Sequence, residues 1–240
     1  MKKLLFYSVF LLTASSYCLS QTSDPLTKHK KFFEVGIQGS LTRVNTNFTD
    51  FTTANGEYKF DKNKYIPSFD ASFNYGSILS LPKIDGVWLY KIGANLVSRK
   101  ADVMNVTEAK NYRLSTQYIQ IPVQLGFRKP ISYASSNSKF YKSIDFSAGL
   151  FISLPVSQRL SDKNDIDSKY KTLKSEYLKY GFIGDITFSA LDDKGHGHKF
   201  GIRVSQEFNK FSKFKDTQYQ LYPFYTSIGV FYNILNKCSK

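Results

Sequence analysis

The sequence contains very little cysteine. Among 240 residues only Cys18 and Cys238 carry a thiol, and Cys18 lies within a segment that has the layout of an export signal. A mature chain with a single thiol cannot form an intrachain disulfide. This excludes a small secreted fold that is stabilised by disulfides.

Long hydrophobic runs are also missing. After residue 20 no stretch of about 18 apolar residues occurs, and no transmembrane helix is therefore expected. The mean hydropathy is −0.32, a value common among water-soluble proteins. A membrane β-barrel reaches similar values, because its lipid-facing residues alternate with polar residues that face the lumen.

Acidic residues are scarce relative to basic ones. The chain has 33 Lys and Arg against 19 Asp and Glu, a net charge of +14, and the loss of Lys2 and Lys3 with a signal leaves +12. In a cytosolic protein this excess would suggest nucleic acid. In an exported protein it indicates outer-membrane lipid, including lipid phosphates, as the partner and excludes nucleic acid.

The first 20 residues indicate export. Lys2 and Lys3 are followed by an apolar run from Leu4 to Leu12 and then by small and polar residues, which is the layout of a signal peptide. We expect a signal peptide over 1–20, cleaved after Ser20, and a periplasmic tail over 21–31. An uncleaved anchor is the alternative, although the run is too short to span a bilayer. Tyr17 disfavours lipidation of Cys18, since a lipobox requires a small residue at that position.

Aromatic residues are abundant, with 17 Tyr and 21 Phe against one Trp, and they accompany a clear alternation. From Ile119 to Phe127 every odd position is apolar, whereas the even positions are polar or small. Alternation with a period of two predicts a β-strand with one apolar and one polar face.

Similar runs recur along the chain and predict eight strands, with a C-terminal tail over 235–240. The expected strands are 32–41, 65–75, 87–97, 118–129, 142–153, 178–189, 199–208 and 221–234. In an exported chain this pattern predicts an all-β fold, an eight-stranded antiparallel up-and-down transmembrane β-barrel over 32–234, in the outer membrane.

The connections between these strands alternate between long and short, as in outer-membrane barrels. The long ones are Thr42–Lys64, Ser98–Ser115, Leu154–Ser175 and Asn209–Gln220. The strands of a soluble β-sandwich also alternate between apolar and polar residues. A sandwich does not account for long connections at one end of the strands and short ones at the other. Aromatic residues recur where the strands meet the short turns, and they predict an outward-facing girdle: Phe33, Tyr75, Trp88, Phe127, Phe146, Phe188, Phe200 and Tyr232.

Candidate catalytic and metal-binding residues are few. His196 and His198 are two residues apart and could share one face of a strand, but no third ligand is evident and His29 lies in the tail. The Gly-x-Ser-x-Gly elbow and the Gly-rich phosphate loop are both missing. We therefore predict no catalytic residue, no metal site and no cofactor, and we interpret the two histidines as solvated residues of a turn.

The expected polar face carries charged residues. They are Glu34, Asp70, Lys91, Arg99, Arg128, Asp145, Asp185, Arg203 and Glu207. The side chains of an eight-stranded barrel fill its interior, and an unpaired buried charge costs several kcal/mol. We therefore predict a salt-bridge network that plugs the lumen, with a conduction path as the alternative. Pro122 on the same face removes a hydrogen-bond donor and predicts a bulge or weakened pairing.

Three segments resemble the PorT-like family of outer-membrane β-barrels. Tyr118-Ile-Gln-Ile-Pro-Val-Gln-Leu-Gly-Phe is similar to a strand of that family, and Phe146-Ser-Ala-Gly-Leu-Phe-Ile and Phe200-Gly-Ile-Arg-Val-Ser are similar to two later strands. The resemblance covers about 32–232 and implies the fold, the location and a role in a secretion or assembly complex. The C-terminus departs from the pattern, because the chain continues past Tyr232 instead of ending on an aromatic residue.

Together these observations predict a structural or interaction protein that is not an enzyme. Its long basic loops would present a surface to lipid phosphates or to a protein partner. Two alternatives remain: a narrow passive channel for ions or small solutes, and a lipid-modifying membrane enzyme.

Overall fold

The structure is a computed structural model that describes residues 31–45, 50–53, 56–79, 86–132, 140–162, 171–173, 178–192, 196–210 and 225–237. The expected signal peptide over 1–20 and nearly all of the expected tail over 21–31 lie outside the described residues, as do His29 and both cysteines. Within the described part, none of the elements is a helix long and apolar enough to cross a bilayer.

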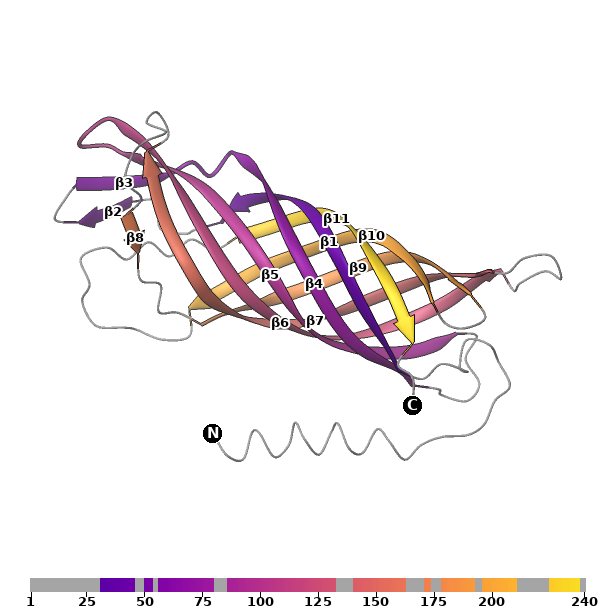
Figure 1. Cartoon of the computed structure of the whole chain (residues 1–240). Coiled ribbons are helices and arrows are strands. Elements are labelled where there is room, and N and C mark those ends of the chain that lie inside the picture. The colour runs from indigo at the N-terminus through magenta and orange to yellow at the C-terminus, as the bar shows by residue number, and fades with distance from the viewer. Residues whose placement is uncertain are drawn as a thin grey trace, which may run out of the picture.

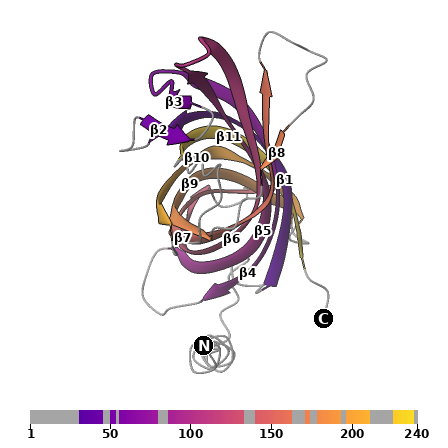
Figure 2. The ribbon, with the colours of Figure 1, turned by 90° about the vertical axis from the view of Figure 1, so that its left-hand side faces the viewer.

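Eight long strands form a closed antiparallel barrel (Figure 1). They are β1 (Lys31–Val44), β4 (Tyr65–Leu79), β5 (Val87–Asn105), β6 (Lys110–Ser132), β7 (Phe140–Asp162), β9 (Lys179–Asp192), β10 (Gly197–Lys210) and β11 (Tyr225–Lys237). Each long strand pairs with the next one along the chain, and β11 pairs with β1. The predicted eight-stranded up-and-down barrel is confirmed, and Figure 2 shows the ring of strands from one end.

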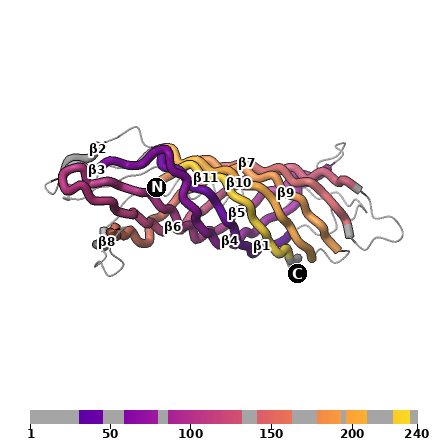
Figure 3. Tube along the Cα trace, turned by 90° about the horizontal axis from the view of Figure 1, so that it is seen from above, coloured from indigo at the N-terminus to yellow at the C-terminus, as the bar shows by residue number. Residues whose placement is uncertain are grey.

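Three short strands extend one end of the barrel. They are β2 (Asp50–Thr53), β3 (Gly56–Phe60) and β8 (Lys171–Leu173). β3 pairs with β2 and with the far end of β5, and β8 pairs with the far end of β7. Figures 1 and 3 show all three beyond the main ring, next to the tips of β5, β6 and β7. We call this end the loop side, and the end at which β1 begins and β11 ends the terminus side.

The predicted connections are wrong in part, because the strands run further than expected and Thr42–Lys64 contains the end of β1 together with β2 and β3. Residues 98–105 and 110–115 continue β5 and β6, and 154–162 continue β7. The inward positions continue there, with Arg99, Ala101 and Val103 all buried. β5 and β6 form a hairpin, and the turn lies at its polar tip. There Asn105 Oδ1 accepts hydrogen bonds from the backbone N–H groups of Thr107 and Glu108 at 3.0 and 3.2 Å.

The two ends of the barrel also differ slightly from expectation. β1 begins at Lys31, one residue before the predicted strand, and β11 continues to Lys237, three residues into the segment predicted as a tail. Phe32 pairs with Lys237, so these outer residues take part in closing the barrel.

The faces of the strands follow the predicted alternation. In β6, Ile121 and Val123 are 38% and 54% exposed, whereas Gln120 and Gln124 are 3% and 1% exposed. The apolar face is therefore the outside of the barrel, and the polar face lines the lumen.

Pro122 interrupts the pairing of β6 with β5. The ladder runs to Ile92↔Val123 and resumes at Asn95↔Gln120 in the same register, with a gap opposite Pro122. This confirms the predicted weakened pairing, since proline cannot donate to the ladder. The register shifts between β6 and β7 lie elsewhere, between Gln117 and Tyr118 and between Pro130 and Ser132.

Candidate functional site

The lumen is the part of the molecule where charged side chains are brought together, and it is arranged in layers. Apolar clusters close it at both ends, and ionised side chains fill the space between them. Whether anything can pass through the barrel therefore depends on how tightly these layers are packed.

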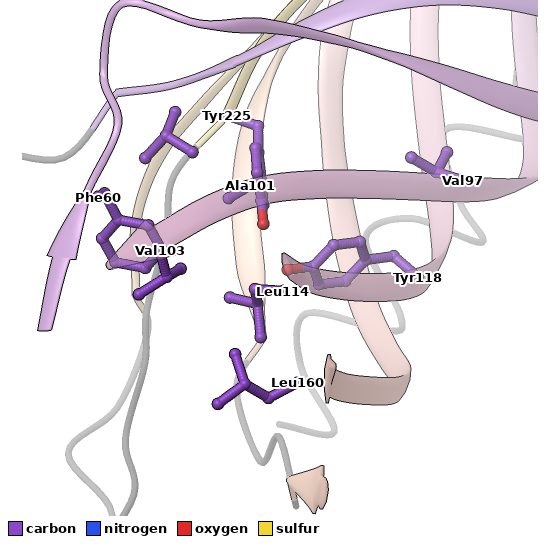
Figure 4. Packing of buried hydrophobic residues seen from close by; sticks show 9 residues of the cluster. Phe60, Val97, Ala101, Val103, Leu114, Tyr118, Leu160 and Tyr225 are labelled. Carbon is purple, nitrogen blue, oxygen red and sulfur yellow. The ribbon is translucent and has the colours of Figure 1, made fainter. Parts of the chain in front are cut away.

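The loop side of the lumen is closed by an apolar cluster that we call the loop-side cap. Its buried members come from six strands, as Figure 4 shows for most of them: Val44, Phe60, Val97, Ala101, Val103, Leu114, Tyr118, Leu160 and Tyr225. β5, β6 and β7 supply six of these nine residues, and four of the six, Ala101, Val103, Leu114 and Leu160, lie in the extended parts of the strands. The lengthened strands therefore help to cover this end of the lumen.

A second cluster, the terminus-side cap, closes the other end. It consists of Phe32, Ile78, Val87, Leu191 and Leu235, all buried. The Phe32 ring also faces the ionic layer, because Lys199 Nζ lies 5.2 Å and Arg128 Cζ 5.9 Å from its centroid. Cation–π contacts thus join this cap to the charged side chains.

Asp185 is the centre of the middle ionic layer. Its two carboxylate oxygens accept hydrogen bonds from Arg203 Nε and Nη2 at 2.7 and 3.0 Å, in a bidentate pair. Lys91 Nζ and Gln124 Nε2 donate to Oδ2 at 3.2 and 3.1 Å. One buried carboxylate thus links strands β5, β6, β9 and β10 across the lumen.

Asp145 and Glu34 form the layer next to the terminus-side cap. Arg128 donates to both Asp145 oxygens at 2.8 and 2.7 Å. Lys199 lies between the two acids, with Nζ 3.0 Å from Asp145 Oδ2 and 2.5 Å from Glu34 Oε1. Asn233 adds a hydrogen bond to Glu34 Oε2 at 3.2 Å.

Two further pairs lie towards the loop side. Arg99 Nη1 contacts both oxygens of Asp70 at 2.9 Å. Lys179 Nζ donates to Glu207 at 3.0 Å and to the Tyr118 hydroxyl at 2.7 Å. Because Tyr118 belongs to the loop-side cap, the ionic network is bonded to that cap as well.

The predicted salt-bridge network is therefore present, and all nine predicted residues are buried. The prediction missed two members, Lys179 and Lys199, each of which directly precedes an outward aromatic residue in its strand. Strict alternation would have placed both in the lumen. With them the described lumen holds six buried cations, Lys91, Arg99, Arg128, Lys179, Lys199 and Arg203, against the five acids named above. Every one of these cations has an acidic partner.

Little space remains between these side chains. A cavity of about 10 Å³ lies among residues that include Gln38, Asn95, Arg99 and Gln120, about enough for one water molecule. Gln38 Nε2 and Asn95 Oδ1 are buried without a hydrogen-bond partner and could bond such a water. In the described residues, the middle of the lumen is occupied by paired ionised side chains.

The histidines are not gathered into a metal site. His196 and His198 are both exposed: the backbone N–H of His196 donates to Asp192 Oδ1 at 2.7 Å, and the His198 ring stacks on Tyr232 at 5.8 Å. Among the described residues no group of three His, Cys, Asp or Glu side chains could hold a metal ion. The structure thus places these residues on the outside of the terminus-side rim.

The outer surface of the barrel is an apolar band edged by aromatic rings. Trp88, Phe127 and Phe146 are paired side by side, as are Phe188, Phe200 and Tyr232. Trp88 packs edge-on against Phe127 at 5.6 Å, and Phe188 stacks on Phe200 at 5.4 Å. An apolar exterior with an aromatic girdle and a polar interior is the arrangement of an outer-membrane barrel, and the chain is a barrel of this kind.

Comparisons with known proteins add the following findings. No protein-family model and no curated protein matches the chain. Two solved structures are similar at low identity. One is Ail, the attachment invasion locus protein of Yersinia pestis, in complex with the heparin analogue sucrose octasulfate, with 12% identity over 86% of this chain and 99% of that one and a TM-score of 0.35. The other is the outer membrane protein OprG from Pseudomonas aeruginosa, with 13% identity over 88% and 95% and a TM-score of 0.40. With TM-scores this low, the fold assignment depends on the strand pairing of the chain itself.

Proposed function

We propose that this chain is a sealed outer-membrane barrel that serves as an anchored scaffold for interactions at the cell surface. The observation that carries the proposal is the construction of the lumen, an ionic core closed by an apolar cap at each end. A passive channel would need a continuous polar path, whereas the cavity between Gln38 and Arg99 holds about 10 Å³ and an apolar cluster lies at each end of the described lumen.

The orientation follows from the connections. Consecutive long strands are separated by four to seven residues at the terminus side (80–86, 133–139 and 193–196). At the loop side they are separated by 14 to 20 residues (45–64, 163–178 and 211–224), except for the four-residue turn 106–109 between the lengthened strands β5 and β6. Outer-membrane barrels have short periplasmic turns and longer extracellular loops. The loop side would therefore face the outside of the cell, and there the extended strands would present a surface to a protein partner.

Conductance in planar bilayers tests the sealed lumen. The full-length protein, purified from outer membranes, is expected to insert without stable openings, while a 16-stranded porin in the same bilayers conducts. Before the measurement, a difference in gel migration between boiled and unboiled samples verifies that the barrel is folded. Stable openings from a heat-modifiable sample would overturn the proposal and favour the passive channel.

A finer proposal is that the scaffold belongs to a secretion or assembly complex, as the resemblance to PorT-like proteins implies. Crosslinking in intact cells through cysteines placed at the exposed hairpin residues Thr107 and Lys110 tests it. We expect a discrete crosslinked species that is lost when the cysteines are moved to the exposed terminus-side residues Lys129 and Lys142. Equal crosslinking from both rims would contradict a partner at the loop side.

The scaffold that we propose needs no catalytic residue, and the lipid-modifying enzyme is a competing function. Replacing both His196 and His198 with alanine is expected to leave the lipid composition of the outer membrane unchanged. A change in acylation or phosphorylation of the lipid, measured by mass spectrometry, would favour the enzyme.

A further inference from the structure

Three basic side chains gather on the outer face of the wall formed by β5, β6 and β7, near the loop side. Lys100 pairs with Ser115, and Ser115 pairs with Arg159 on the next strand. Arg113 lies two residues from Ser115 on the same face. Directly opposed residues have Cβ atoms about 5 Å apart, so Lys100 and Arg159 flank Ser115 within reach of one anion. We call these four residues the basic patch.

The basic patch lies one membrane thickness above the aromatic girdle. Trp88 and Phe127 form a cross-strand pair, as do Lys100 and Ser115, and twelve residues separate the two pairs along both strands. At about 3.3 Å per residue this is about 40 Å along the strand. With a strand tilt of about 40° the rise is about 30 Å, which is the thickness of the hydrocarbon core. The basic patch therefore lies at the level of the lipid headgroups.

The wall between the girdle and the basic patch carries no charge on its outer face. Its outward residues on β5 and β6 are Tyr90, Ile92, Ala94, Leu96, Ser98, Leu125, Val123, Ile121, Ile119 and Gln117. From the girdle towards the loop side, the apolar side chains precede Ser98 and Gln117. These two polar residues lie one outward position before Lys100 and Ser115 on β5 and β6. A lipid with its headgroup at the patch would thus have its acyl chains against an uncharged wall.

The charges around the patch favour an anion. The next outward row contains Asp102, whose carboxylate is shared by Arg113 Nε at 3.0 Å and Lys64 Nζ at 2.7 Å. Asp102 thus bridges two basic residues there, and Lys100 lies in the adjacent outward row. Basic residues near a membrane surface attract anionic lipid headgroups, and arginine binds phosphate through charge-assisted hydrogen bonds.

We propose that the basic patch binds the phosphate group of an outer-leaflet lipid, with Lys100, Arg113 and Arg159 contributing charge and Ser115 a hydroxyl donor. This inference rests on the membrane placement in the proposed function and names the lipid chemistry that the scaffold would recognise. The ligand is a lipid and not a soluble anion, because the patch ends an apolar wall that acyl chains cover.

Lipid retention tests the inference. The full-length protein is folded in neutral-detergent micelles, lipid A carrying two phosphates is added, and native mass spectrometry measures the fraction of barrels that hold a lipid. The double variant Lys100→Gln/Arg159→Gln is expected to bind about 30-fold more weakly, from about 1 kcal/mol per basic residue near the surface. Lys100→Arg is expected to bind like the wild type. Lipid A without phosphates is expected to bind as weakly as the double variant does.

The matched control is Lys129→Gln/Lys142→Gln, which removes two exposed lysines from the opposite rim of β6 and β7 and is expected to change binding less than twofold. An equal loss in both double variants would overturn the inference in favour of unspecific attraction. Displacement of the lipid by millimolar inorganic phosphate would overturn it in favour of a soluble anion.

Conductance and gel migration are measured on the same samples. If the barrel is heat-modifiable and does not conduct but fails to hold the lipid, the lipid site is wrong and the sealed scaffold is unaffected. If the barrel shows stable openings but still holds lipid A in a phosphate-dependent way, only the sealed scaffold is overturned.

Discussion

Individual charges in the lumen are held by partners from distant strands, and each partner is needed. Arg203 satisfies Asp185 through a bidentate pair, and Lys91 approaches the same carboxylate from β5. All three side chains are almost completely buried, so neither cation could turn to water if the acid were lost. Breaking a buried pair from one side leaves uncompensated charge and is far more destabilising than losing a surface pair.

Asp185→Asn is therefore expected to lower the free energy of unfolding by about 3–5 kcal/mol, because two buried cations lose their counter-charge. Urea unfolding in lipid vesicles, followed by the fluorescence of the single tryptophan, Trp88, measures the change. The control is Glu108→Gln, which removes an exposed carboxylate hydrogen-bonded to Tyr112 and should cost about 0–1 kcal/mol. Equal effects in the two variants would contradict a tightly packed ionic core.

At the level of the elements, β6 carries both the interior and the membrane-facing chemistry of the barrel. Its inward residues Gln120, Gln124 and Arg128 belong to the polar lumen, while its outward residues run from Phe127 in the girdle to Ser115 in the basic patch. Ile121 lies midway between Phe127 and Ser115, and Gln117 is close to the upper end. The strand therefore spans the whole depth of the bilayer.

A charge placed on the outer face of β6 is expected to be costly according to its depth. Ile121→Lys should destabilise the folded barrel by about 2–4 kcal/mol, and Gln117→Lys by about 0–1 kcal/mol, because a lysine at the midplane cannot reach the headgroups. Urea unfolding in vesicles of one lipid composition compares the two variants. Equal costs would mean that these two residues do not differ in membrane depth.

For the whole molecule, stability depends on closure of the ring. The pairing of β1 with β11 extends from Phe32↔Lys237 to Val44↔Tyr225 and leaves none of the eight long strands with a free edge over its main length. Unpaired backbone groups in lipid cost several kcal/mol each, so an open sheet cannot persist there.

Deletion of 225–240 is expected to abolish the heat-modifiable band, because β1 and β10 would both become edges within the bilayer. Boiled and unboiled membrane fractions on a denaturing gel give the readout. Deletion of 238–240, which leaves β11 whole, should migrate like the wild type. A heat-modifiable band from the longer deletion would show that β11 is dispensable for closure.

Much of the architecture follows from local pattern. The alternation of Ile121 and Val123 with Gln120 and Gln124 correctly predicts which face meets lipid, and the nine predicted inward charges are all buried. The prediction failed where polar residues were taken for a loop, at Ser98–Ser115, although Val97, Ala101 and Val103 kept the period of two. Charged residues on the outer face, such as Lys100 and Arg113, are typical of a loop. Here they belong to strands that extend beyond the apolar band.

The sequence by itself determined the strands, their two faces and therefore the inside and outside of the barrel, because side chains alternate along every strand whatever its neighbours. Only the tertiary structure decided which charges meet, since Lys199 and Glu34 are 165 residues apart and become partners through the closure and stagger of the ring. The registers of the β5–β6 and β6–β7 pairs align Lys100, Ser115 and Arg159 in one row, and this row could not be derived from the period of any single strand.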